Sequence, residues 1–108
     1  MPSSTYTVFR QAMLGRKLIS CTYQGRRRDV APHILGFKQK AEKARVFQFA
    51  GETNSSLPPG GEWRCFALSE VGDVTSYDGP WREGPSHRSR QACVDVVDVD
   101  VNVPATLR

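Results

Sequence analysis

The chain of 108 residues lacks several features that would assign it to a class. No apolar run approaches the roughly 20 residues that a membrane-spanning helix needs. Residues 1–5 contain no basic segment followed by an apolar one, so we expect no secretory signal. Cys21, Cys65 and Cys93 form no CxxC pair, which argues against a zinc finger and against a disulfide framework. An odd number of unclustered thiols is typical of a reducing compartment, and we expect a cytoplasmic protein.

Motifs for catalysis and metal binding are also missing. Pro58–Gly61 is not followed by a Lys-Ser/Thr pair, so it is not a phosphate-binding loop. No Ser-His-Asp set and no pair of carboxylates stands out. Residues 98–102 resemble the opening of an EF-hand loop, but Val103 stands where that loop needs glycine. We therefore expect no enzyme, no bound metal and no cofactor.

Positive charge is concentrated in the first part of the chain. There are 15 Lys+Arg against 11 Asp+Glu, a net charge of +4. Residues 1–60 carry ten basic and three acidic residues, whereas residues 61–108 carry five basic and eight acidic ones. Such a one-sided field attracts polyanions, although ordinary solubilising charge explains it equally well.

One helix is predicted, over residues 5–15. Tyr6, Phe9, Met13 and Leu14 recur on one apolar face. Gly15 is suited to end the helix.

The pattern then changes to that of strands. Leu18–Tyr23 and Arg26–Pro32 form a hairpin around the Gln24-Gly25 turn. Turn-rich stretches separate the later strands, and alternation in the last of them predicts one buried and one solvated face. This pattern predicts a single, mainly β domain over residues 1–108, a small and strongly bent barrel of five to six strands preceded by one short helix. Its parts are the barrel (18–78), a polar loop (79–90) and a C-terminal strand (94–103).

The register of the hairpin places arginine beside apolar side chains. With a two-residue turn, Tyr23 faces Arg26 and Cys21 faces Arg28, so Arg28 shares a sheet face with Tyr23. Arg64 likewise shares a face with Phe66. An arginine on a core-facing stripe must either be paired or face a ligand at the rim of the barrel.

Two interpretations of these arginines stay open. Guanidinium groups bind phosphate or carboxylate oxygens bidentately, and Tyr23 adds a stacking face, which favours a site for single-stranded nucleic acid or a nucleotide. Alternatively, Arg28 pairs with Asp29, Glu62 or Glu70, or a bulge turns it to solvent.

Several segments, in this order, resemble the WYL domain. They are Ile-Ser-Cys-Thr-Tyr at 19–23, the arginines at 26–28, Val-Ala-Pro-His-Ile-Leu-Gly at 30–36, the strands at 47–49 and 63–66, and Leu-Ser-Glu-Val at 68–71. The resemblance covers residues 8–82. It implies an SH3-type, Sm-like β-barrel preceded by a short helix. The name-giving tripeptide is not intact, because Cys21-Thr22-Tyr23 keeps only the tyrosine.

The resemblance implies a regulatory ligand-sensing module linked to transcription regulation in bacteria and their phages. WYL domains usually follow a DNA-binding helix-turn-helix, which 17 residues before the barrel cannot hold. We therefore expect the sensor part alone, with a separate DNA-binding regulator as a candidate partner and no membrane. The ligand it implies is nucleic acid, single-stranded in preference, or a nucleotide-like anion. The candidate binding residues are Tyr23, Arg26, Arg28, His33, Gln48 and Arg64.

Further expectations concern the remaining features. Cys21 and Cys65 lie on predicted strands and are expected to be small core residues. The basic turns Arg26–Arg28 and Lys38–Lys43 are candidate contacts to a phosphate backbone, with solvated hairpin tips as the alternative. Residues 94–103 could instead form a homodimer by strand pairing, which would make the chain an assembly module.

Overall fold

The structure, a computed structural model, describes residues 2–51, 60–83 and 92–102. They form one α-helix, six strands and a short 3₁₀ helix, η1 (Leu68–Glu70). In chain order the elements are α1 (Ser4–Leu14), β1 (Leu18–Tyr23), β2 (Arg26–Lys38), β3 (Ala41–Gly51), β4 (Glu62–Ala67), β5 (Val71–Tyr77) and β6 (Val96–Asp100). The prediction of a mainly β chain with one N-terminal helix is confirmed. Most of the expected loop at 79–90 and the end of the expected strand at 94–103 lie outside the described residues.

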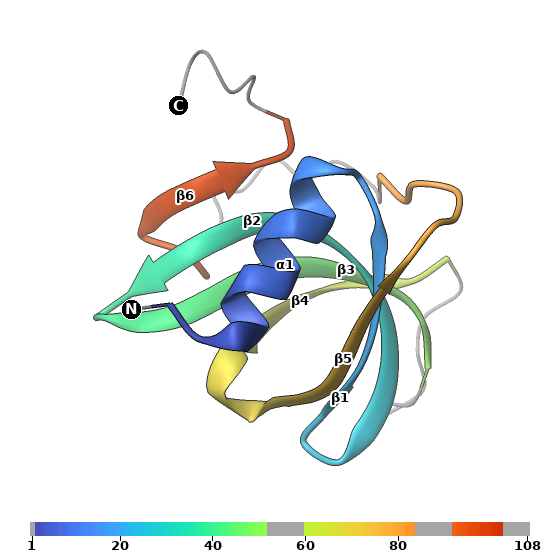
Figure 1. The fold of residues 1–108 in the computed structure, drawn as a ribbon, viewed down its shortest axis with the longest axis horizontal. Helices are drawn as coiled ribbons and strands as arrows, with labels where there is room; N and C mark the ends of the chain where they lie inside the picture. The colour runs from blue at the N-terminus through green and yellow to red at the C-terminus, as the bar shows by residue number, and fades with distance from the viewer. Residues whose placement is uncertain (1, 52–59, 84–91, 103–108) are drawn as a thin grey trace.

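The strands form one antiparallel sheet in the order β4-β3-β2-β1-β5. The sheet bends strongly around the core, and α1 lies across it between β5 and β6 (Figure 1). The predicted hairpin register is confirmed, because Tyr23 pairs with Arg26 and Cys21 pairs with Arg28. This register turns Arg28 inward, towards the side of the sheet that packs on the core.

Helix α1 closes the core on one side. Ser3 caps its first turn, since the Ser3 hydroxyl accepts a hydrogen bond from the Tyr6 backbone N–H. Phe9 and Met13 are buried against the sheet. Leu14, which the spacing placed on the same face, is instead 53% exposed because it ends the helix and turns away from the sheet. With eleven residues, this helix is too short and too polar to cross a membrane.

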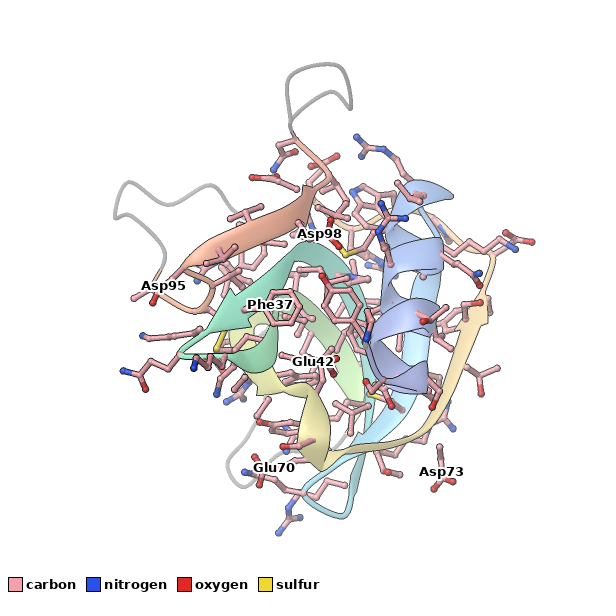
Figure 2. The ribbon with its side chains drawn as sticks, turned by 60° about the vertical axis from the view of Figure 1, so that its left-hand side comes forward. Phe37, Glu42, Glu70, Asp73, Asp95 and Asp98 are labelled. Atoms are coloured by element: carbon pink, nitrogen blue, oxygen red, sulfur yellow. A yellow bond between two sulfur atoms is a disulfide. The ribbon has the colours of Figure 1, made fainter. Side chains whose placement is uncertain are left out.

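Strand β6 pairs with the second half of β2, beyond the part of β2 that pairs with β1. Gly36 permits this close approach, because a Cβ at that position would collide with the Val96 carbonyl. Asp98 fixes β6 to the helix, because it accepts a hydrogen bond from the Tyr6 hydroxyl (2.6 Å) and forms an ion pair with Arg10 (3.2 Å). Figure 2 labels Asp98 on β6.

The expected alternation of β6 holds only in part. Val99 is buried, but Val97 is 45% exposed, although both were expected on one buried face. A register shift between Leu35 and Gly36 separates the two pairings and turns Val97 outward.

One cysteine expectation is wrong. Cys65 is exposed rather than part of the core, and it forms a disulfide with Cys93, with the two Cα atoms 5.5 Å apart. The bond joins residues 28 apart in sequence, so spacing alone could not reveal it. Cys21 is the buried core thiol that was expected, and burial raises its pKa to about 12. With two cysteines paired, the count of unclustered thiols no longer indicates a reducing compartment.

Candidate anion-binding pocket

A pocket of about 420 Å³ opens between the edge strand β4 and the β1–β2 turn. We call it the arginine pocket, because two guanidinium groups from separate strands line it. Its described lining residues, none of them acidic, are Tyr23, Gln24, Arg28, Trp63, Arg64, Cys65 and Phe66. Arg28 and Arg64, two of the candidate binding residues, therefore line one pocket.

Arg28 lies at the inner end of this pocket and is only 4% exposed. Its Nη1 donates to Gln48 Oε1 and its Nη2 donates to the Tyr23 carbonyl oxygen, both at 3.3 Å. Its Nε is buried and has no hydrogen-bond partner among the described residues. No carboxylate of the described residues forms an ion pair with it, so the pairings with Asp29, Glu62 or Glu70 are absent there.

The environment of Arg28 disfavours its positive charge. Burial lowers the pKa of the guanidinium, and the nearby cation of Arg64 lowers this pKa further. Arginine nevertheless keeps its proton in proteins, so the charge persists without a counter-charge. A buried cation in this state is stabilised most directly by an anion that enters the pocket.

Stacked aromatic rings support Arg28. The rings of Tyr23 and Phe66 are nearly parallel, with centroids 4.0 Å apart, and the Arg28 guanidinium carbon lies 5.4 Å from the Tyr23 centroid. The Tyr23 hydroxyl accepts from the Ala67 backbone N–H at 3.0 Å and donates to Glu70 Oε2 at 3.3 Å. Tyr23 is thus fixed beside Arg28, whose guanidinium carbon also lies 6.0 Å from the Phe66 centroid.

Arg64 is more exposed and partly neutralised. Its Nη2 lies 2.7 Å from Glu62 Oε2, an ion pair whose angles are not those of a hydrogen bond. Its Nε is buried without a hydrogen-bond partner among the described residues. The side chain points to the pocket because Arg64 pairs with the buried Val46 of β3, which sets the inward phase of β4.

Three predicted site residues do not line the pocket. Gln48 is fully buried and acts behind it, holding Arg28 through Oε1 while its Nε2 donates to the Ala50 carbonyl oxygen at 3.2 Å. Arg26 is half-buried beside Tyr23 in the hairpin and is not a lining residue.

His33 belongs to a separate group, which we call the histidine cluster: His33, Trp63 and Trp81. A bulge between Pro32 and Ile34 interrupts β2 at His33, whose ring lies 4.8 Å from that of Trp63 and 5.1 Å from that of Trp81. Its Nε2 donates to the Arg82 carbonyl oxygen at 2.8 Å. Burial lowers the pKa of His33, and its Nδ1 has no partner among the described residues. His33 therefore packs as a neutral ring away from the two arginines.

Sequence reasoning did not assign Trp63 and Gln24 to the site. Trp63 alternates out of phase with Arg64, yet it lines the pocket because β4 is an edge strand. Gln24 occupies the turn with a φ of 53°, a left-handed conformation, and lines the pocket from there. Their positions in the sequence could have indicated both residues. A side chain on an edge strand or in a hairpin turn can reach a pocket at the edge of the sheet from either face.

Comparison with protein-family models, with curated proteins and with solved structures yields no match. The resemblance to the WYL domain therefore stays a prediction. Among the described residues, no three His, Cys, Asp or Glu side chains are grouped so that they could hold a metal ion.

Proposed function

We propose that this chain is a regulatory module of the WYL type that binds single-stranded nucleic acid or a nucleotide-like anion in the arginine pocket. The observation that carries the proposal is Arg28. It is a buried, permanently charged side chain without a carboxylate partner among the described residues, and it lines the same pocket as a second arginine.

The chemistry of the pocket supports a phosphate or carboxylate ligand. Arg64 is the more exposed cation and receives the anion first, exchanging part of its contact with Glu62 for the ligand. Arg28, held in place by Gln48, supplies the deeper positive charge. Trp63 and Gln24 border the opening, where an aromatic ring and an amide suit a nucleobase.

The test is a titration of a 5′-phosphorylated, fluorescently labelled octathymidylate, followed by anisotropy. Arg28→Gln and Arg64→Gln remove one charge each while keeping a hydrogen-bond donor. Each should weaken binding about tenfold to a hundredfold, the range of one lost charge-assisted hydrogen bond. Circular dichroism checks that both variants fold.

Arg27→Gln is the matched control. Arg27 is the neighbouring arginine, but it is exposed, pairs with Asp29 at 3.5 Å and does not line the pocket. Its replacement should change affinity about threefold at most, through the general field alone. Equal losses in all three variants, or no binding at low salt, would reject the proposed pocket.

An assembly function is the second candidate, and the exposed side chains of β6 favour it. Val96 is 65% exposed and Val97 is 45% exposed, on a strand for which only β2 is a partner among the described residues. If β6 pairs with its copy, light scattering gives the mass of a dimer, and Val96→Lys with Val97→Lys gives that of a monomer. A monomeric mass for the unaltered chain would reject this candidate.

The compartment we propose is the cytoplasm, where nucleic acid is available as a ligand. Cys65 and Cys93 would there be thiols unless an oxidant pairs them. Alkylation of the protein in rapidly quenched cells, read by mass spectrometry, distinguishes the two states. A fully oxidised pair would place the protein in an oxidising compartment instead.

A further inference from the structure

A second pocket lies next to the arginine pocket. It measures about 300 Å³, and we call it the lysine pocket because Lys38 and Lys43 line it. The other described lining residues are Gln39, Ala41, Cys65, Ala92 and Cys93, and none of these seven residues is acidic. It lies over the turn between β2 and β3 and the disulfide that joins β4 to the segment before β6.

The two pockets meet at one residue. Cys65 lines both of them, so its exposed side chain and the disulfide form part of the wall between the arginines and the lysines. Arg45 is the cross-strand partner of Cys65 on β3, and its guanidinium carbon lies 4.8 Å from the Trp63 ring centroid. Arg45 thus adds a positive charge on the strand beside Cys65, although it lines neither pocket.

Hydrogen bonds to backbone carbonyl oxygens join the segments that form the lysine pocket. Lys38 Nζ donates to the Ala92 carbonyl oxygen at 2.7 Å, and the Asp95 backbone N–H donates to the Phe37 carbonyl oxygen at 2.9 Å. With the disulfide, these contacts fix the segment around Cys93 against β2 and β4. The ammonium group of Lys38 keeps two further N–H donors.

We propose that the ligand is a strand of at least two linked phosphates that crosses Cys65, with one phosphate at Arg28 and Arg64 and another at Lys38 and Lys43. This inference rests on the proposed function and names the class within it: single-stranded nucleic acid rather than a free mononucleotide. A flexible polyanion can place one phosphate in each of two cationic pockets that share the lining residue Cys65. Trp63, which lines the arginine pocket two residues before Cys65, favours a nucleic acid over an acidic peptide, because every base offers a face for stacking.

The experiment compares 5′-phosphorylated thymidylates of one, two, four and eight nucleotides, by calorimetry for the shortest and by anisotropy competition for the others. Affinity should rise about tenfold or more between the mononucleotide and the tetranucleotide, as the second pocket becomes occupied. Replacing Lys38→Gln and Lys43→Gln together should remove this gain and change the affinity for the mononucleotide about threefold at most, through the general field alone. The dependence of log K on log salt for the tetranucleotide should fall by about 0.7 per lost phosphate contact.

Lys40→Gln is the control, because Lys40 belongs to the same turn but does not line either pocket. It should keep the gain with length. If the mononucleotide binds through Arg28 and Arg64 but longer strands bind no tighter, this inference fails and the proposed function stands. If an equally charged oligo-aspartate competes as well as the tetranucleotide, the assignment to nucleic acid is overturned. If no thymidylate binds at all, the proposed function fails first.

Discussion

The arginine pocket and the histidine cluster each contain a buried, nitrogen-bearing side chain from β2. These side chains, Arg28 and His33, are five residues apart in sequence. His33 and Arg28 are almost fully buried among aromatic rings, and each has a ring or guanidinium nitrogen without a hydrogen-bond partner among the described residues. Their chemistry separates them. Histidine avoids the cost of a buried charge by losing its proton, and burial lowers its pKa accordingly. Arginine cannot lose its proton, so Arg28 leaves a charge to be compensated. Similar burial therefore marks a packed residue in one place and a candidate ligand contact in the other.

The largest expected effect concerns β4, which supplies both regions. Trp63 contacts His33, while Arg64 and Phe66 line the pocket, and between them Cys65 bonds to Cys93. Replacing both cysteines by serine should lower the free energy of unfolding by about 3 kcal/mol, because the closed loop no longer restricts the unfolded chain. Urea denaturation with and without a reductant measures this change. An unchanged midpoint for the unaltered protein under reductant would mean that β4 is held by the sheet alone.

A ligand should stabilise the protein through the arginine pocket and not through the histidine cluster. At about a hundredfold excess over its Kd, octathymidylate should add about 2.7 kcal/mol to the free energy of unfolding, seen as a rise in melting temperature. Arg28→Gln, which should bind about tenfold to a hundredfold more weakly, should reduce this gain to between about 1.4 and about 0.4 kcal/mol, whereas His33→Gln should keep it. A rise that disappears with His33→Gln would place the ligand at the histidine cluster and break the distinction.

The fold was largely predictable because its signals are local. The Gln24-Gly25 turn set the register of the hairpin, and that register alone turned Arg28 inward beside Tyr23. The alternation in residues 63–68 likewise put Arg64 and Phe66 on one face. A shift of one residue in the register of either strand would have reversed these faces. The prediction therefore depended on the turn residues, which fix the register of the hairpin.

The rest depended on contacts between distant parts of the chain. Nothing near Cys65 or Cys93 indicates that they pair, and the bulge that moves His33 away from the arginines has no marker besides Pro32. The aromatic partner Trp81 lies in a turn-rich segment without periodicity. These features follow from how β4, β6 and the segment around Trp81 pack, which a pattern within one strand does not contain.

The stacked pair of Tyr23 and Phe66 beside Arg28 gives a smaller effect. Tyr23→Phe keeps the stack on Phe66 but removes the hydroxyl that accepts from the Ala67 backbone N–H and donates to Glu70. We expect a loss of about 1 kcal/mol in the free energy of unfolding, because a buried backbone donor loses its partner. Affinity for octathymidylate should fall about threefold at most, since the ring that faces Arg28 remains. A loss as large as that of Arg28→Gln would mean that the hydroxyl itself contacts the ligand.

The smallest expected effect tests the other side of the comparison, the neutral state of His33. Its pKa in the folded protein is lowered by burial, so as the pH falls below about 6.5 the unfolded chain takes up a proton before the folded one does. The stability that the neutral ring contributes is therefore fully present above about pH 6.5 and is lost as the pH falls through the folded pKa. Melting temperatures between pH 7.5 and pH 5 should decrease less for His33→Gln, whose amide can still donate to the Arg82 carbonyl oxygen. An NMR titration of the His33 ring measures its pKa in the folded protein directly. A midpoint at or above that of free histidine would mean that a charge is tolerated at His33, and burial would no longer distinguish it from Arg28.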